Sequence, residues 1–99
     1  LFEYVLDGMS MVPPKNSDVG GHHLAFYVDD IAAAVDYLKA RGCEVQGEIV
    51  TMADGPSGRL SWVYFLSPWG MQLELVSYPH GMQVLDGSPD ALWSPKDPA

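Results

Sequence analysis

The spacing of hydrophobic and polar residues changes along the middle of the chain, and each stretch with a regular spacing predicts one element of secondary structure. Residues 22–28 alternate as the two faces of a strand do. Residues 31–41 carry apolar side chains at the i, i+3, i+4 and i+7 positions of a helix. These side chains are Ile31, Ala34, Val35 and Leu38. Asp29 or Asp30 is placed to cap the start of this helix, and Gly42 is placed to end it in the left-handed conformation.

Three further strands are predicted after the helix, at 44–50, 60–67 and 71–77. The stretch 51–59 between the first two is polar and rich in Gly and Pro, which indicates a loop. Ser67-Pro68-Trp69-Gly70 predicts a tight turn into the last strand. The element order is therefore β-α-β-β-β, and the predicted fold class is α+β.

The alternation assigns each strand residue to one of two faces of the sheet. The face under the helix is apolar and consists of Leu24, Phe26, Val28, Val63, Phe65, Leu73 and Leu75. The opposite face is mixed and consists of His23, Ala25, Tyr27, Trp62, Tyr64, Leu66, Gln72, Glu74 and Val76. An imidazole and a carboxylate share this mixed face, so we expect any chemistry to occur there.

The start of the chain resembles the end of its last predicted strand. Leu1-Phe2-Glu3-Tyr4 is similar to Leu75-Val76-Ser77-Tyr78, and such a repeat is typical of two copies of one structural unit. Chance similarity of two strand ends is the alternative. We expect residues 1–6 to be the last strand of a preceding module.

The expected domain boundaries follow from this interpretation. They are 1–6 for that strand, 7–19 for a linker, 20–79 for the β-α-β-β-β module and 80–99 for a C-terminal tail. In the tail, Leu92 and Trp93 are expected to dock, because an exposed tryptophan forgoes about 2 kcal/mol of burial. A disordered chain end is the alternative.

Composition and charge narrow the classes of function. The 99 residues, 47% of them hydrophobic, fit one soluble domain. A formal net charge of -8 argues against nucleic acid or an anionic membrane as partner, because no basic stripe exists to bind phosphates. No apolar run approaches the roughly 20 residues of a membrane helix. The single Cys43 cannot form an internal disulfide, which favours a cytoplasmic location.

His23 and Glu74 are the candidate metal ligands, since both lie on the mixed face, whereas the adjacent His22 points away from it. Glu74 stands between Leu73 and Leu75, and burying a carboxylate is costly unless a cation meets it. An imidazole nitrogen with a carboxylate oxygen suits Zn, Ni, Fe, Mn or Co. A half-buried histidine bonded to a polar neighbour, without metal, is the alternative. Two ligands are too few for a catalytic site, so a second module must supply the others.

Four further residues of the mixed face are candidate substrate contacts. Tyr27 and Gln72 carry polar groups beside the expected metal site, and Trp62 and Tyr64 could form an apolar wall for an organic substrate. Packing at the core or its edge is the alternative for all four.

The motifs resemble the vicinal oxygen chelate superfamily, which includes glyoxalase, bleomycin resistance proteins and extradiol dioxygenases. The resemblance covers about residues 20–79 and rests on His23-Leu24-Ala25-Phe26-Tyr27-Val28-Asp29-Asp30, on the helix and on the ending Ser67-Pro68-Trp69-Gly70 with Leu73-Glu74-Leu75-Val76. It implies a curved mixed sheet paired with a second module, a divalent metal between the modules, and His23 and Glu74 as metal ligands. The second module would come from residues before Leu1 or from another copy in a homodimer.

The resemblance also implies three functions. The leading hypothesis is a metal-dependent lyase or isomerase of the glyoxalase type that acts on a small carbonyl compound by enediolate chemistry, with Glu74 as metal ligand, proton-transfer base, or both. An Fe(II) extradiol dioxygenase is the alternative enzyme, and it would need one further histidine. A metal-free protein that binds an apolar small molecule, as in bleomycin resistance, is the third hypothesis.

Overall fold

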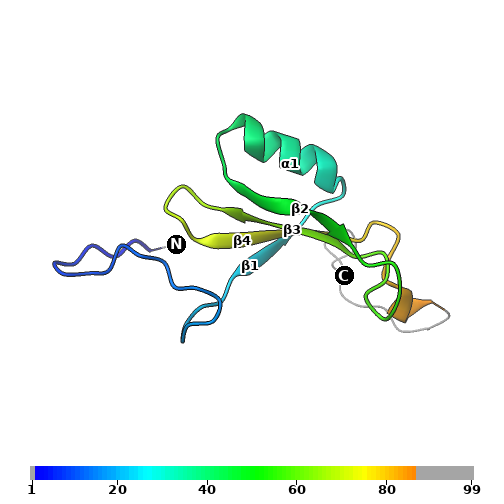
Figure 1. The fold of residues 1–99 in the computed structure, drawn as a ribbon, viewed down its shortest axis with the longest axis horizontal. Coiled ribbons are helices and arrows are strands. Elements are labelled where there is room, and N and C mark those ends of the chain that lie inside the picture. Colours follow the sequence, from blue (N-terminus) through cyan, green and yellow to red (C-terminus); the bar gives the residue numbers. More distant parts are fainter. Residues whose placement is uncertain (1, 87–99) are drawn as a thin grey trace.

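The computed structural model describes residues 2–86, which form one sheet with a helix on one face (Figure 1). The elements are β1 (Leu24–Tyr27), α1 (Ile31–Ala40), β2 (Val45–Thr51), β3 (Ser61–Leu66), β4 (Gln72–Ser77) and a 3-10 helix η1 (Gln83–Leu85). Each predicted helix and strand between residues 22 and 77 is present, with ends shifted by no more than two residues.

The four strands lie in the order β1-β4-β3-β2. β1 runs parallel to β4, whereas β4 with β3 and β3 with β2 are antiparallel, so the sheet is mixed. The predicted α+β fold class and the β-α-β-β-β order are therefore confirmed. Within the described residues, no helix is long and apolar enough to cross a membrane.

The helix begins and ends where the sequence predicts. The Asp30 carboxylate accepts a hydrogen bond from the Ala33 backbone N–H at 3.0 Å, which satisfies an otherwise unpaired donor of the first turn. Gly42 has φ of +77°, the left-handed conformation in which a residue with a side chain is strained. The Asp30 cap and the left-handed conformation of Gly42 set the two ends of α1, and the chain then turns back into β2.

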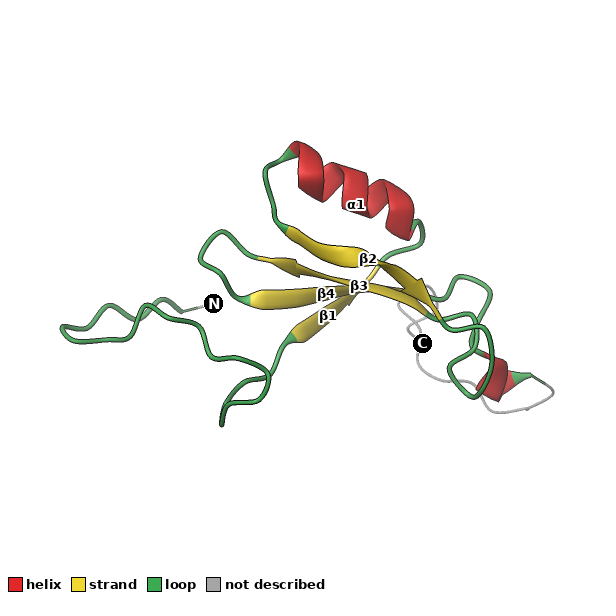
Figure 2. Cartoon of the chain, in the orientation of Figure 1, coloured by secondary structure: helices red, strands yellow, loops and turns green. Residues whose placement is uncertain are grey.

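α1 lies over one face of the sheet (Figure 2), and the hydrophobic core lies between the two. Its buried members are Val35, Val63, Phe65 and Leu75. Val35 is the buried residue of the helix, and Val63, at 2% exposure, lies at the centre of β3. This arrangement confirms which residues of β3 and β4 were predicted to face the helix. The opposite face of the sheet is left available for a site.

The prediction that Leu24 and Phe26 are covered by the helix is wrong. The register pairs them with Leu73 and Leu75 of β4, yet Leu24 is 56% exposed and Phe26 49% exposed. The reason is the position of α1, which contacts β2 and β4, whereas neither Leu24 nor Phe26 packs against the core cluster. β1 is also an edge strand, so no other strand of the described part of the chain pairs with its outer side.

The two ends differ from the expectations as well. Residues 2–6 form no strand, and Phe2 and Tyr4 are largely exposed. The assignment of residues 1–6 to a preceding module, like the other domain boundaries, stays a prediction. The tail contains η1, which was not expected, and Leu92 and Trp93 lie outside the described residues.

Candidate functional site

His23 and Glu74 lie together on the face of the sheet opposite α1. Glu74 is in β4, directly beside Ala25 of β1, and His23 precedes β1 by one residue. The Nε2 atom of His23 is 3.4 Å from Oε1 of Glu74. The side chains are 27% and 15% exposed, so both are partly shielded from water yet reachable. The face shared by the imidazole and the carboxylate is the one that strand alternation predicts.

Tyr64 completes this cluster from the other side of Glu74. It is the residue directly opposite Glu74 in the antiparallel pair β3–β4. Its ring meets the His23 ring edge-on, with 5.3 Å between centroids and 83° between planes. Partial burial, together with the neighbouring Glu74 carboxylate, raises the pKa of the Tyr64 hydroxyl above its ordinary value. Tyr64 therefore keeps its proton at neutral pH and can donate it in a hydrogen bond.

The donor pair fits half of a divalent metal site. Two ligands of one tetrahedral ion, each about 2.1 Å from it, lie about 3.4 Å apart, and the His23 and Glu74 atoms have this separation. Within residues 2–86, no cluster of three or more His, Cys, Asp or Glu side chains could hold an ion. The pair therefore fits a shared ion only with further ligands from elsewhere.

A cavity of about 300 Å³ adjoins Glu74. It is lined by Met52, Ser57, Leu60, Trp62, Tyr64 and Glu74. Trp62 and Tyr64 were expected to form a wall here, and the structure places both in it. Met52, Ser57 and Leu60 were not anticipated, because they belong to the β2–β3 loop and its edges, where no periodicity predicts a direction for a side chain.

Tyr27 and Gln72 point to neighbours other than Glu74. The Tyr27 ring packs against Tyr78 with centroids 5.0 Å apart, and burial with a neighbouring Asp29 raises its pKa. The Gln72 side-chain amide donates to Oε1 of Gln46 at 3.1 Å. Neither residue lines the cavity beside Glu74. Their role as substrate contacts stays a prediction.

The comparisons with known proteins agree with this fold. A relative from Actinomyces sp., named 2-epi-5-epi-valiolone epimerase, is 45% identical over 97 residues. That alignment covers 97% of this chain and 53% of the relative, so the chain spans about half the length of the protein it matches.

Solved structures of two glyoxalase family proteins share the fold. The protein from Enterococcus faecalis is 28% identical, with a TM-score of 0.57 over 72% of this chain and 53% of that one. The protein from Bacillus cereus is 23% identical, with a TM-score of 0.56 over 70% of this chain and 44% of that one, and supports the fold alone. The family model of the Glyoxalase/Bleomycin resistance protein/Dioxygenase superfamily matches residues 3–75, and the chain belongs to this superfamily.

Proposed function

We propose that this chain carries half of the active site of an epimerase that inverts a stereocentre next to the carbonyl group of a small hydroxylated ketone. The observation that carries the proposal is a partly buried Glu74, beside His23 and Tyr64, in the wall of a cavity of about 300 Å³. The relative named as an epimerase favours this isomerase chemistry over the dioxygenase and the metal-free binding protein.

Glu74 is the proposed base. Its carboxylate is 15% exposed and lines the cavity, so it is reachable by a substrate bound there, and a carboxylate within hydrogen-bond reach of a substrate proton is a candidate general base. The Glu74 carboxylate oxygen that does not face His23 would take the proton from the carbon next to the carbonyl. Epimerisation then requires a proton on the opposite side of that carbon, and the second half of the site is the proposed source of that proton.

Tyr64 and His23 support this step. The Tyr64 hydroxyl, protonated at neutral pH, could donate a hydrogen bond to a substrate oxygen as negative charge develops there. Nε2 of His23 and the Glu74 carboxylate would together hold a divalent ion from the set Zn, Ni, Fe, Mn and Co. When bound, such an ion supplies Lewis-acid stabilisation of negative charge beside the carbonyl.

A second module is part of the proposal. β1 has one hydrogen-bonded neighbour and presents the half-exposed Leu24 and Phe26 at its edge. Such an edge is normally covered in a stable protein. A second module, from the same protein or from a homodimer partner, would cover this edge and bring the remaining ligands toward His23.

The experiment uses the full-length protein with 2-epi-5-epi-valiolone, and the change of configuration is followed by proton NMR. We expect turnover, stoichiometric divalent metal by elemental analysis, and a loss of kcat of about 100-fold or more in Glu74→Gln, because a positioned base contributes at least that much. Glu48→Gln removes a carboxylate from an exposed position of β2 and serves as the matched control. Wild-type turnover and metal content in Glu74→Gln would contradict the proposal, as would a lack of turnover by the wild type.

A further inference from the structure

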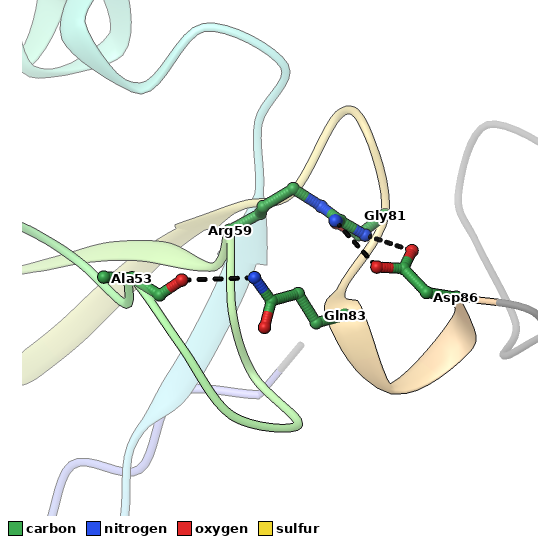
Figure 3. Close-up of polar contacts among 5 residues, drawn as sticks. All are labelled: Ala53, Arg59, Gly81, Gln83 and Asp86. Atoms are coloured by element: carbon green, nitrogen blue, oxygen red, sulfur yellow. Dashed lines mark hydrogen bonds and ion pairs between the residues drawn. The ribbon is translucent and has the colours of Figure 1, made fainter.

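The chain that follows β4 folds back onto the β2–β3 loop, residues 53–60 (Figure 3). The backbone N–H of Gln83 donates to the Gly58 carbonyl at 3.1 Å, and that of Val84 donates to Pro56 at 3.0 Å. The Gln83 side-chain amide donates to the Ala53 carbonyl at 3.2 Å. Residues 81–86 thus form a strap along the loop, and we use this name for them below.

Arg59 fastens this strap from the side of the loop (Figure 3). Its Nε donates to the Gly81 carbonyl at 2.9 Å. Its two terminal nitrogens lie 3.1 and 2.8 Å from the two carboxylate oxygens of Asp86, in the bidentate geometry that gives such pairs their specificity. One side chain therefore holds both ends of the strap.

The backbone of Arg59 shows that this contact constrains the loop. Arg59 is the residue other than glycine with a positive φ within residues 2–86, at +74°. A side chain in the left-handed region costs free energy, and such conformations persist where the surroundings hold them. The Arg59 N–H donates to the Met52 carbonyl at 2.8 Å, so the strained residue closes the hairpin as well as the strap.

A close approach at Gly58 belongs to the same junction. A Cβ atom built on Gly58 would collide with the middle of the Gln83 side chain. Gly58 is itself buried, between the loop and the strap. Any larger residue at this position would push Gln83 away from Ala53 and open the junction without changing a charge.

The fastened loop is also a wall of the cavity beside Glu74. Ser57 and Leu60, on either side of Gly58 and Arg59, line that cavity, and Met52 lies where the loop leaves β2. Arg59 and Asp86 do not line it. The position of these wall residues therefore depends on contacts made outside the cavity.

We propose that Arg59 is a positioning residue: by fastening the strap through Gly81 and Asp86, it holds the β2–β3 loop against the cavity and so sets how tightly a substrate is bound beside Glu74. The assignment of the cavity as a substrate-binding site rests on the proposed epimerase function. The strap, by contrast, shapes the cavity whether or not that function is correct.

The first test needs no substrate. In a background with Trp69→Phe and Trp93→Phe, Trp62 is the sole tryptophan and reports on the cavity it lines. Quenching of its fluorescence by acrylamide should increase in Asp86→Asn, in Arg59→Asn and in Gly58→Ala. Asn tolerates the left-handed conformation, so Arg59→Asn removes the guanidinium without adding backbone strain. Asp54→Asn changes one exposed charge in the same loop and should leave quenching unchanged.

The second test is kinetic, in the full-length protein with 2-epi-5-epi-valiolone. Asp86→Asn should raise KM by about two- to fivefold, as expected for one exposed ion pair, with kcat unchanged. Arg59→Lys should recover part of the loss in Arg59→Asn. Raising the salt concentration should raise KM in the wild type and have less effect in Asp86→Asn, because salt screens an exposed ion pair.

The outcomes separate the two proposals. If Trp62 is quenched equally in the wild type, Asp86→Asn and Gly58→Ala, the strap does not hold the cavity wall and the inference is wrong. If Asp86→Asn lowers kcat at unchanged KM, its role in substrate binding is refuted. If quenching changes as expected but the wild type does not convert the compound, the proposed epimerase function fails and the strap stands.

Discussion

Two phenylalanines on the same face of the sheet should differ strongly in their contribution to stability. Phe65 is 7% exposed in the core, whereas Phe26 is 49% exposed on β1. Phe65→Ala removes a buried ring and leaves a cavity, which costs about 3–5 kcal/mol. Full burial of a phenylalanine contributes about 1.5–3 kcal/mol, so Phe26, half as buried, should lose about 1 kcal/mol in Phe26→Ala.

Urea unfolding followed by far-UV circular dichroism measures the free energy of unfolding of each variant, from the midpoint of the transition and its dependence on urea concentration. Phe65→Leu, which keeps most of the volume and should cost less than about 1.5 kcal/mol, provides a milder variant if Phe65→Ala does not fold. Equal losses in Phe26→Ala and Phe65→Ala would refute the assignment of α1 to the β2–β4 part of the sheet. A larger loss for Phe26→Ala in the full-length protein than in this chain is expected if a second module covers β1. The same loss in both would contradict pairing with a second module of the same protein.

Three further predictions follow from single contacts. Asp30→Ala should lower the free energy of unfolding by about 1 kcal/mol, because it removes the helix cap, whereas Asp36→Ala on the exposed side of α1 should have little effect in the same urea experiment. Since Tyr64 has a raised pKa, stability should fall as pH rises above about 10 through that pKa, and Tyr64→Phe should remove this part of the alkaline loss in a pH series of melting curves. The hydrogen bond from Arg59 lowers the pKa of Asp86, so the strap should stay fastened at pH values above the ordinary aspartate pKa of about 3.9. It should be released as the pH falls through the lower pKa of the folded state. Quenching of Trp62 would detect this release, and the pH dependence should be absent in Asp86→Asn.

The elements and the two faces of the sheet could be predicted because they depend on local, repeating patterns. The helix period and its cap at Asp30 involve neighbouring residues, and the two-residue period of a strand decides which side a residue faces. The same parity predicts that His23 and Glu74 share one face, whichever way the strands pair. Their separation of 3.4 Å followed from the parallel pairing of β1 with β4.

The exposure of Leu24 and Phe26 could not be predicted from the sequence. The alternation of a strand indicates which face of the sheet a side chain lies on, but not which part of that face the helix covers. The contacts of Arg59 were also hidden from the sequence. Arg59 and Asp86 are 27 residues apart, and both lie in irregular segments where no period indicates a direction. Three of the cavity residues, Met52, Ser57 and Leu60, reach the site through this same irregular loop.

Incorporation of deuterium from the solvent reports directly on proton removal by Glu74. The full-length protein would convert 2-epi-5-epi-valiolone in D₂O, and NMR would locate deuterium in the product. We expect one deuterium at the inverted carbon with the wild type and with Glu48→Gln, and a rate of incorporation lower by about 100-fold or more with Glu74→Gln. Inversion without deuterium, or undiminished incorporation with Glu74→Gln, would contradict proton removal by Glu74.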